Sequence, residues 1–318
     1  MVIHVTDDLD LDRIAESGQC FRWQKTEENT YRIIAGSYCL YISSLGGGGF
    51  ELDCSGEEFD CFWSDYFDLS ENYREIRARI DPVSDPFLWQ AAEHEKGIRI
   101  LRQDPWEMLI SFIISQNKNI PAIRRSIELL AETCGEKRTD RRGEAYYAFP
   151  GPKAVASLSE EELKGCRLGY RCKYVHAAAE AVAGGEIDLE ELAGERNRLS
   201  GEDRLPGEDQ LTGKDQLTGK EQLHGEEDRA IEALTGDDQL PGVEDRAIAA
   251  LTGLFGVGVK VANCVSLFGL HHVDAFPIDV WVKRILETEY PDGYPYERYS
   301  PYNGICQQYM FAWYRHKE

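Results

Sequence analysis

The sequence predicts an α+β fold in which an N-terminal antiparallel sheet domain precedes a mainly helical domain. Three observations predict it. The first eighty or so residues contain short aromatic and β-branched runs separated by polar turns, an apolar spacing typical of helices begins at Phe87, and a helix start signal stands at Asp104. We expect the sheet domain to cover residues 1–100 and the helical domain to cover residues 101–318.

Three runs carry the strand pattern: residues 21–24, 31–34 and 39–42. Polar turns separate them, and four consecutive glycines follow the third run at positions 46–49. Short runs joined by turns pair with their neighbours, which predicts a twisted antiparallel sheet.

The clearest helix start in the chain is the sequence Asp104-Pro105-Trp106-Glu107. It combines a capping acid, a first-turn proline and a glutamate three residues on, as in a capping box. Residues 108–114 are apolar on nearly every side, so this helix should be buried inside the helical domain. Amphipathic patterns predict further helices over residues 123–134, 174–182 and 245–251.

The net charge of −22 is unusual for a protein that binds nucleic acid. Residues 186–246 contain 19 acidic and 7 basic residues, so this segment alone supplies −12 of the −22. The rest of the chain is only mildly acidic. Basic residues gather in two places there, at Lys118, Arg124 and Arg125, and at Arg167, Arg171 and Lys173.

Glycine recurs every six residues in this acidic segment, from position 201 to position 225, and residues 227–236 are almost repeated at 244–253. One apolar residue in six cannot offset the entropy of ordering. We therefore expect residues 195–243 to form an acidic, repetitive and disordered insertion in the helical domain. Alternatives are an acidic tether for a partner and a DNA mimic that guards the binding groove. A solenoid is disfavoured because such short units bury too little.

The nine cysteines include no C-x2-C pair and no cluster with histidine. This argues against a disulfide framework, a zinc site and an iron–sulfur cluster, so we expect mostly buried free thiols, no metal and no cofactor. No apolar run is long enough to span a membrane, and residues 1–8 lack the features of a signal peptide. We expect no membrane partner and a cytoplasmic location, near the nucleoid in a bacterium, or a nuclear one in a eukaryote.

The strongest local signal for function is a Gly-x-Gly turn, Gly256-Val257-Gly258, between two helical patterns. Glycines allow a tight turn, and the free amides of the second helix point at an anion. This predicts a helix-hairpin-helix in which Gly256 and Gly258 hold a DNA phosphate without reading sequence. Lys260 follows directly, and the residues alone leave it as either a nucleophile or one more phosphate contact.

A Pro-x-Asp sequence that ends at Asp279 lies nineteen residues after Lys260. Hairpin, lysine and aspartate at this spacing resemble the catalytic core of the helix-hairpin-helix glycosylase superfamily. In that superfamily the aspartate caps a helix and faces the nucleophile across the lesion pocket. An N-cap without catalytic function is the alternative for Asp279, and the two roles are compatible.

The chain resembles one branch of this superfamily, the 8-oxoguanine DNA glycosylases, over nearly its whole length apart from the insertion. The iron–sulfur motif of the endonuclease III and adenine glycosylase branches is absent, and alkylpurine glycosylases usually lack the lysine. Five motifs carry the resemblance: Ser-Gly-Gln-Cys-Phe-Arg-Trp at 17–23, Arg-Gln-Asp-Pro at 102–105, Ser-Gln-Asn-Lys-Asn-Ile at 115–120, Leu-Gly-Tyr-Arg at 168–171 and Gly-Ile-Cys-Gln-Gln-Tyr-Met-Phe at 304–311.

The resemblance implies a TATA-binding-protein-like sheet domain, a helical domain and a glycosylase that also nicks DNA as an AP lyase. Lys260, made neutral by burial, would attack the sugar, and Asp279 would stabilise the positive charge that develops there. In the base pocket, the carbonyl of Gly18 would accept the N7 hydrogen of 8-oxoguanine, which guanine lacks. The remaining pocket residues are Cys264 and Phe311, which would sandwich the base, and Gln307, which would read its Watson–Crick edge. Core packing is the alternative for Cys264 and Phe311.

The resemblance also implies contacts to DNA. Asn117 would approach the base opposite the lesion, Tyr170 would wedge into the stack, and Arg171 would contact the orphaned base. An ordinary pair at a helix edge is the alternative for the last two. Ala122, Trp281 and Lys118 depart from the eukaryotic pattern and favour a bacterial-like branch, and Ala122 removes one donor to an opposite cytosine.

The expected partner is damaged double-stranded DNA, bound by a monomer. Two other functions remain open: a helix-hairpin-helix glycosylase for another damaged base, and a non-catalytic helix-hairpin-helix DNA-binding protein. The lysine and aspartate pair argues against the second.

Overall fold

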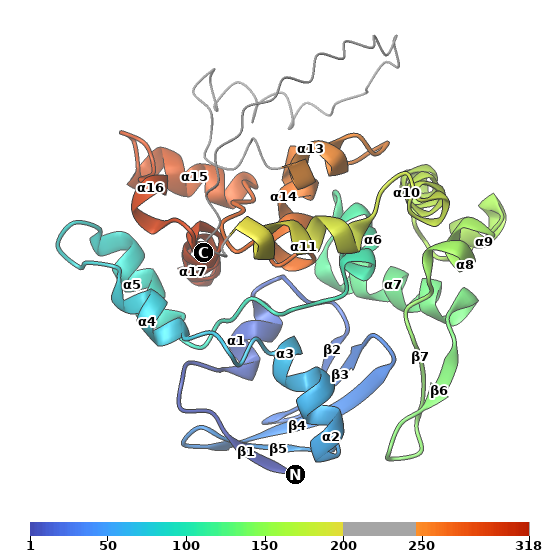
Figure 1. The fold of residues 1–318 in the computed structure, drawn as a ribbon, viewed down its shortest axis with the longest axis horizontal. Helices are drawn as coiled ribbons and strands as arrows, with labels where there is room; N and C mark the ends of the chain where they lie inside the picture. The colour runs from blue at the N-terminus through green and yellow to red at the C-terminus, as the bar shows by residue number, and fades with distance from the viewer. Residues whose placement is uncertain (200–245, 318) are drawn as a thin grey trace, which may run out of the picture.

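The computed structural model describes residues 1–199 and 246–317. Figure 1 shows the N-terminal sheet at the lower end of the molecule, with the helical body above it. The predicted start of the disordered insertion at residue 195 is wrong, because residues 195–199 form the end of helix α11 (Leu189–Leu199). From residue 200 onward the insertion lies outside the described residues.

The sheet has five antiparallel strands in the order β1-β5-β4-β3-β2. Its strands are β1 (Val2–His4), β2 (Trp23–Glu27), β3 (Thr30–Ala35), β4 (Tyr38–Gly46) and β5 (Gly49–Leu52). The predicted sheet is therefore confirmed, although the first predicted strand begins two residues later, at Trp23. The turn between β4 and β5 needs its glycines, because Gly46, Gly47 and Gly48 all have positive φ.

Short helices also occur in the N-terminal region, where the sequence predicts only strands. They are α1 (Leu11–Glu16), α2 (Gly56–Glu58), α3 (Ser64–Tyr66) and α4 (Tyr73–Ala78), with a π-helical segment between α2 and α3 at Phe59–Trp63. Each spans at most two turns, too short for a helical period to stand out. Local caps start α1 and α4: the Asp10 side chain accepts a hydrogen bond from the Arg13 amide, and the Asn72 side chain accepts one from the Glu75 amide.

The helical body contains all four predicted helices. Its elements are α5 (Pro86–His94), α6 (Pro105–Ser115), α7 (Ile120–Cys134), α8 (Pro152–Ala156), α9 (Glu160–Gly165), the 3₁₀ turn Gly169–Arg171, α10 (Cys172–Gly184), α11 (Leu189–Leu199), α13 (Arg246–Thr252), α14 (Val259–Phe268), α15 (Val280–Glu289), α16 (Tyr296–Tyr299) and α17 (Asn303–Lys317). A small hairpin, β6 (Lys137–Thr139) and β7 (Ala145–Tyr147), follows α7.

Helix α6 runs through the middle of this body, as its sequence predicts. Asp104 Oδ1 accepts a hydrogen bond from the Glu107 amide at 2.8 Å, and every residue from Trp106 to Ile114 is buried. The predicted capping box is only half formed. The Glu107 carboxyl does not accept a hydrogen bond from the backbone amide of Asp104. It is buried and interacts electrostatically with Arg22 instead.

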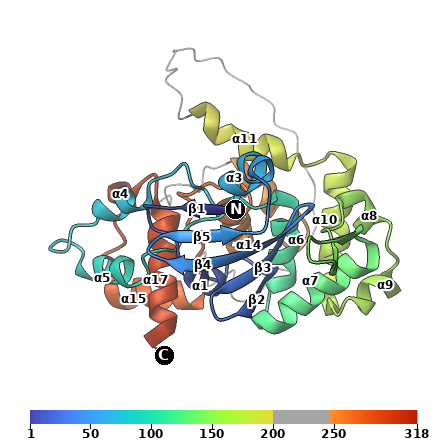
Figure 2. The same ribbon diagram turned by 90° about the horizontal axis from the view of Figure 1, so that it is seen from below.

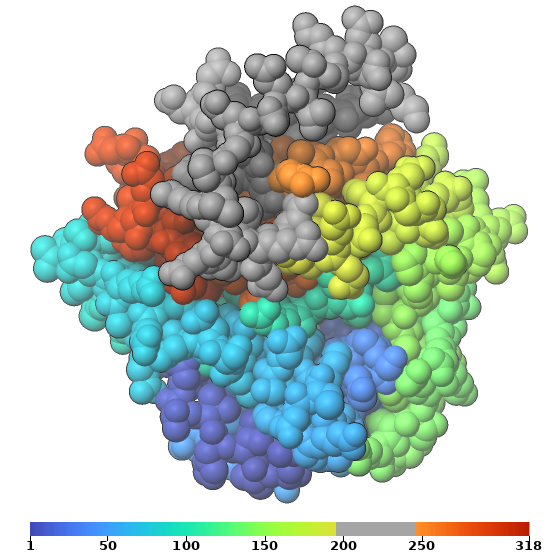
Figure 3. Space-filling view, viewed as in Figure 1, coloured from blue at the N-terminus to red at the C-terminus, as the bar shows by residue number. Residues whose placement is uncertain are grey.

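Two large hydrophobic cores and one small cluster of four residues are buried in the described part of the chain. The core under the sheet is formed by residues between 11 and 67 together with Leu101, whereas the core of the helical body includes Tyr73, Leu88 and Ala91. Residues 73–100, which the sequence assigns to the sheet domain, therefore pack with the helices. Figure 2 shows the sheet lying across one face of the helical body, and Figure 3 shows the N-terminal residues gathered at the lower end of the molecule.

The buried Arg99 ties the two parts together. Its guanidinium donates hydrogen bonds to the carbonyl oxygens of Asp8 and Asp68 and forms an ion pair with Asp7. The ring of Tyr73 lies 4.5 Å from it. An arginine without exposed surface is tolerated because each part of its charge has a partner.

All nine cysteines are free thiols and seven are buried, as the sequence predicts. None of the described helices is long and apolar enough to cross a membrane.

Candidate active site

The predicted hairpin joins α13 to α14. Gly256 adopts a φ of +83°, the Val257 amide donates to the carbonyl of Leu254 at 3.1 Å, and Gly258 is the extended N-cap of α14. Gly258 offers no side chain to the first amides of that helix. These amides have no acceptor inside the helix and can therefore bind an anion.

Two neighbouring segments hold the hairpin in place. A Cβ atom at Gly256 would lie 2.2 Å from Cγ of Tyr174, so the hairpin backbone lies directly against the Tyr174 ring on α10. On its other side, Gln116 Nε2 donates a hydrogen bond to the carbonyl of Gly256 at 3.0 Å. Only glycine fits between these contacts without a shift of the backbone.

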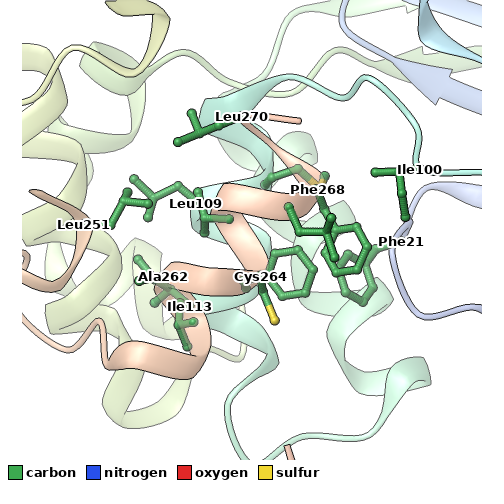
Figure 4. Close-up of a cluster of buried hydrophobic side chains, with 14 of the residues drawn as sticks. Phe21, Ile100, Leu109, Ile113, Leu251, Ala262, Cys264, Phe268 and Leu270 are labelled. Atoms are coloured by element: carbon green, nitrogen blue, oxygen red, sulfur yellow. The ribbon is translucent and has the colours of Figure 1, made fainter. Parts of the chain in front are cut away.

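Lys260 and Cys264 lie one helical turn apart on α14, so their side chains share a face. Lys260 is half-buried, and its Nζ lies 5.9 Å from the centre of the Phe112 ring. Cys264 is 4% exposed and belongs to the buried cluster shown in Figure 4. The ring of Phe112 stacks in turn on Phe268 at 5.5 Å.

Asp279 caps α15. Its Oδ1 accepts hydrogen bonds from the amides of Trp281 and Val282, both at 2.9 Å. Its second carboxylate oxygen makes no hydrogen bond to another of the described residues. The predicted N-cap is therefore present, with one oxygen left for another task.

The charges of Lys260 and Asp279 both influence the thiol of Cys264. Burial raises the pKa of its thiol; the charge of Lys260 lowers it, and that of Asp279 raises it. Both charges are thus within electrostatic reach of one buried sulfur atom. Lys260 lies on α14 and Asp279 at the start of α15, and their convergence on one substrate stays a prediction.

Gly18 lies against Phe311. It has a φ of +84°, and a Cβ atom there would lie 3.6 Å from Cε1 of the Phe311 ring. The Gly18 carbonyl accepts no hydrogen bond from any described residue. A buried or half-buried carbonyl without a partner is ready to accept a donor from a ligand.

Gln307 links α17 to the segment that carries Asp279. It is 3% exposed, and its Nε2 donates to the carbonyl of Pro277 at 3.1 Å. Its Oε1 accepts a hydrogen bond from Gln308 at 2.9 Å. The predicted pocket residues Phe311 and Gln307 thus come from one helix, and each contacts a different segment of the site.

Two cavities, of about 570 and 550 Å³, lie elsewhere, around the N-terminal end of α6. Neither is lined by Lys260, Cys264, Asp279 or Phe311. The candidate active site is therefore defined by facing chemical groups and not by either of these cavities.

Asn117 and Tyr170 are neighbours on the surface. Asn117 is exposed with a φ of +48°, and its Nδ2 lies 3.4 Å from the hydroxyl of Tyr170, which is 52% exposed. Two of the residues expected to contact DNA are therefore adjacent and accessible.

Arg171 is buried beneath the Asn117 loop in the free protein, and its predicted contact with the orphaned base stays a prediction. The residue is 6% exposed, and its guanidinium donates to the carbonyl oxygens of Gln116, Asn117 and Leu168. The carbonyls that follow α6 have no helical partner, and the arginine satisfies them. In the free protein Arg171 orders the Asn117 loop, and the Tyr170 ring lies 4.4 Å from its charge.

Two residues near the site, Tyr174 and Arg315, are not predicted from the sequence. Tyr174 supports the hairpin, and nothing in its helical pattern indicates this because the contact is with a distant segment. Arg315 lies over the Phe311 ring at 5.2 Å and close to Gly18. Its position four residues after Phe311 could have placed it on the same face of the helix.

The departures from the eukaryotic pattern have local structural roles. Asn119 caps α7 by accepting a hydrogen bond from the Ala122 amide at 3.0 Å. Lys118 Nζ donates to Ser126 Oγ at 2.6 Å and to the Arg167 carbonyl at 2.8 Å. Burial and the nearby charge of Arg171 lower the pKa of Lys118. Trp281 packs under the guanidinium of Arg284 at 5.2 Å.

One group among the described residues has metal-ligand spacing: His94, Glu95 and His316. Both imidazoles bond to Oε1 of the buried Glu95, at 2.8 and 2.9 Å, and Arg13 pairs with Oε2. The arginine opposes a metal cation there, and these hydrogen bonds account for the arrangement.

Comparisons with known proteins agree with this geometry. Residues 1–109 match the family model described as 8-oxoguanine DNA glycosylase, N-terminal domain, and residues 110–291 match that of the HhH-GPD superfamily base excision DNA repair protein. The chain is 32% identical to the N-glycosylase/DNA lyase of Saccharomyces cerevisiae, over 89% of this chain and 69% of the relative. It is 28% identical to that of Arabidopsis thaliana, over 87% of this chain and 65% of the relative.

The chain therefore spans about two thirds of the length of these two relatives. A solved structure, the 8-oxoguanine glycosylase/lyase of Clostridium acetobutylicum in complex with double-stranded DNA that contains cytosine opposite 8-oxoguanine, is similar with a TM-score of 0.76. The two are 29% identical, and the match covers 100% of this chain and 98% of the other.

Proposed function

The chain belongs to the HhH-GPD superfamily of base excision DNA repair proteins and carries the N-terminal domain of the 8-oxoguanine DNA glycosylases, and on this premise we propose that it removes 8-oxoguanine from duplex DNA and then nicks the strand. The proposed substrate is damaged double-stranded DNA, and the proposed active form is a monomer in the compartment that holds the cell's DNA.

One observation carries the proposal: Lys260 lies one helical turn from the buried Cys264 on α14, directly after a hairpin whose first amides can hold an anion, and Asp279 caps α15 with one carboxylate oxygen that bonds to no described residue. A protein that only binds DNA phosphates needs the hairpin. It has no need of a lysine and a carboxylate facing one apolar site.

The chemistry follows from these two groups. The Lys260 amine, in its neutral form, attacks C1′ of the extruded nucleoside, so that a C1′–N bond forms while the bond from C1′ to the base breaks. The free oxygen of Asp279 stabilises the positive charge that develops on the sugar. One proton of the amine passes to the departing base, and the other passes to O4′ as the C1′–O4′ bond breaks, which leaves the opened sugar held as a Schiff base. Loss of a C2′ proton expels the 3′ phosphate and nicks the strand.

The pocket residues divide the recognition of the base. The unpartnered carbonyl of Gly18 accepts the N7 hydrogen of 8-oxoguanine, while guanine would leave two acceptors facing each other. Phe311 and Cys264 hold the faces of the base, and Gln307 reads its Watson–Crick edge. Gln307 keeps its bond to Pro277, so reading the base and positioning the Asp279 segment depend on the same helix.

The duplex is held and opened by neighbouring loops. The hairpin at Gly256 and Gly258 binds a phosphate, Tyr170 fills the space left by the extruded base, and Asn117 approaches the base opposite. We assign Arg171 the positioning of Asn117, since its guanidinium bonds to that loop.

Borohydride trapping of the Schiff base tests the nucleophile. The native protein should form a covalent adduct with a duplex that contains 8-oxoguanine. Lys260→Gln should reduce trapping and base release at least about a thousandfold, because the amide cannot form the imine, while binding to the duplex is retained. Lys283→Gln, a second partly exposed lysine near Asp279, is the matched control and should trap normally.

The lesion itself is tested with a panel of duplexes carrying 8-oxoguanine, alkylated purines or oxidised pyrimidines, each opposite all four bases. Preferred release of 8-oxoguanine supports the proposal. Trapping by Lys260→Gln at the native level would show that Lys260 is not the nucleophile. Preferred release of another lesion would show that the substrate is not 8-oxoguanine, although the mechanism could be the same.

A further inference from the structure

The two most exposed aromatic side chains of the described residues lie near each other. Phe255, in the hairpin, is 53% exposed, and Tyr170 is 52% exposed. Tyr174 lies between them: its ring is 5.1 Å from Phe255 and 5.8 Å from Tyr170, in edge-to-face contact with both. We call these three residues the aromatic strip.

The strip is fixed in position. The hairpin backbone at Gly256 lies on the Tyr174 ring, Gln116 bonds to the Gly256 carbonyl, and Arg171 bonds to the carbonyl of Gln116. Three loops from distant parts of the sequence are therefore joined beneath it. Phe255 is exposed because the backbone holds it there and not because the loop lacks contacts.

The exposed part of Phe255 is not needed to hold the fold. Its ring meets that of Tyr174 edge-to-face at 5.1 Å, yet 53% of Phe255 stays exposed, directly before the glycines that turn the backbone toward an anion. Phe255 and Tyr170, joined through Tyr174, leave a continuous patch of exposed ring surface beside the hairpin, and such a patch indicates a contact with the ligand.

We propose that Phe255 is a DNA-contacting residue, whose ring packs on a deoxyribose of the strand whose phosphate the hairpin binds. This inference rests on the proposed function and extends it. The aromatic strip runs from the wedge Tyr170 to the hairpin, so the contact at Phe255 keeps the strand seated while Tyr170 enters the stack. The sugar offers a flat apolar face, and the adjacent phosphate is taken by the hairpin amides.

The test measures binding to a duplex with an uncleavable abasic-site analogue, so that no catalysis is needed. Phe255→Ala should weaken the dissociation constant about tenfold, which corresponds to about 1.4 kcal/mol. The slope of log Kd against log salt should stay unchanged, because no phosphate contact is lost. Phe255→Leu, which keeps apolar surface, should restore part of the affinity.

The matched control is Trp89→Ala. Trp89 is an exposed aromatic residue on α5, which lies on the side of the molecule away from α10 in Figures 1 and 2, and its loss should leave binding unchanged. Thermal unfolding of each variant reports on the fold. Equal affinity of Phe255→Ala and the native protein for the duplex would overturn the proposal. A loss of affinity would also overturn it if the slope of log Kd against log salt, or the unfolding temperature of the variant, fell as well.

This outcome is separate from the proposed function. A native protein that releases no 8-oxoguanine, but whose DNA binding depends on Phe255, would refute the function and leave the contact standing. If Phe255→Ala traps and nicks normally and binds DNA with native affinity, the proposed function stands and the contact at Phe255 is refuted.

Discussion

At the scale of single residues, Glu107 is a buried acid inside the most apolar helix. It is 6% exposed, and burial raises its pKa to about 7. The charge of Arg22 pulls the pKa down, while Asp104 and Glu128 push it up, and burial outweighs the attraction. Arg22 is itself engaged by Glu128 at 2.8 Å and by the carbonyl of Tyr147 at 2.6 Å.

Glu107 makes stability depend on pH with a defined sign. Between the ordinary value of 4.5 and about 7, the folded protein binds this proton more tightly than the unfolded chain does. The free energy of unfolding therefore falls as the pH rises through this window, by up to about 3 kcal/mol. Glu107→Gln should remove this loss, so urea unfolding at pH 5, 6, 7 and 8 should show the variant gaining on the native protein as the pH rises.

The exposed Glu161 on α9 provides the control, and Glu161→Gln should shift stability by the same amount at every pH. A constant difference between Glu107→Gln and the native protein across the series would show that Glu107 is already ionised at pH 5.

At the scale of elements, the start of α15 combines structure and chemistry in one side chain. One carboxylate oxygen of Asp279 accepts hydrogen bonds from the amides of Trp281 and Val282. The other oxygen makes no bond to a described residue, and the two functions can be separated because asparagine also caps helices well.

Asp279→Asn should keep the free energy of unfolding within about 0.5 kcal/mol of native, yet lower single-turnover excision at least about a hundredfold, since the amide cannot balance a positive sugar. Asp279→Ala should lose about 1 kcal/mol of stability in addition. Urea unfolding and a gel assay for strand cleavage measure the two effects.

Asp104, which caps α6 in the same way, supplies the comparison: Asp104→Asn should leave excision unchanged. If Asp279→Asn excises the base at the native rate, Asp279 serves only as the N-cap of α15 and has no catalytic role.

Elements differ in how far their sequence predicts them. Helices α6, α7, α10 and α13 are long or strongly patterned, and the sequence predicts each of them. Of the short helices, α1, α2 and α4 each begin at a single capping side chain, such as Asn72, whereas α3 has none. A pattern needs several turns to be visible, and these helices have one or two.

At the scale of the whole molecule, the net charge of −22 opposes the proposed binding of DNA, which is itself a polyanion. Residues 200–245, which lie outside the described residues, contain 14 acidic and 4 basic residues and so supply −10 of that charge. The remaining −12 belongs to the part that carries the hairpin.

Replacing residues 200–245 by an uncharged glycine–serine linker of equal length should tighten DNA binding at least about threefold at 50 mM salt, because a repulsive charge is removed. The gain should shrink toward zero near 0.5 M salt as screening increases. Fluorescence anisotropy with a labelled duplex over a salt series measures this.

A segment of the same composition in scrambled order should behave like the native protein. Tighter binding that persists at high salt, or no change at low salt, would show that net charge is not what the segment contributes.

The sequence by itself determined the family, the fold class and the candidates for chemistry. Each depends on local information: Gly256 and Gly258 specify a turn, an unbroken apolar run specifies a buried helix, and the spacing between Lys260 and Asp279 is a property of the chain. Such patterns can be interpreted without knowing the tertiary contacts, because backbone preference and hydrophobic periodicity act over a few residues.

Only the tertiary structure decided which partner each side chain takes. Arg171 turns toward the carbonyls after α6, Tyr174 supports a hairpin about eighty residues away, and α4 and α5 join the helical core although they precede the predicted boundary. These outcomes depend on burial and on unsatisfied polar groups brought together by the fold. No spacing in the sequence encodes the distance between two segments that meet only when the chain has packed.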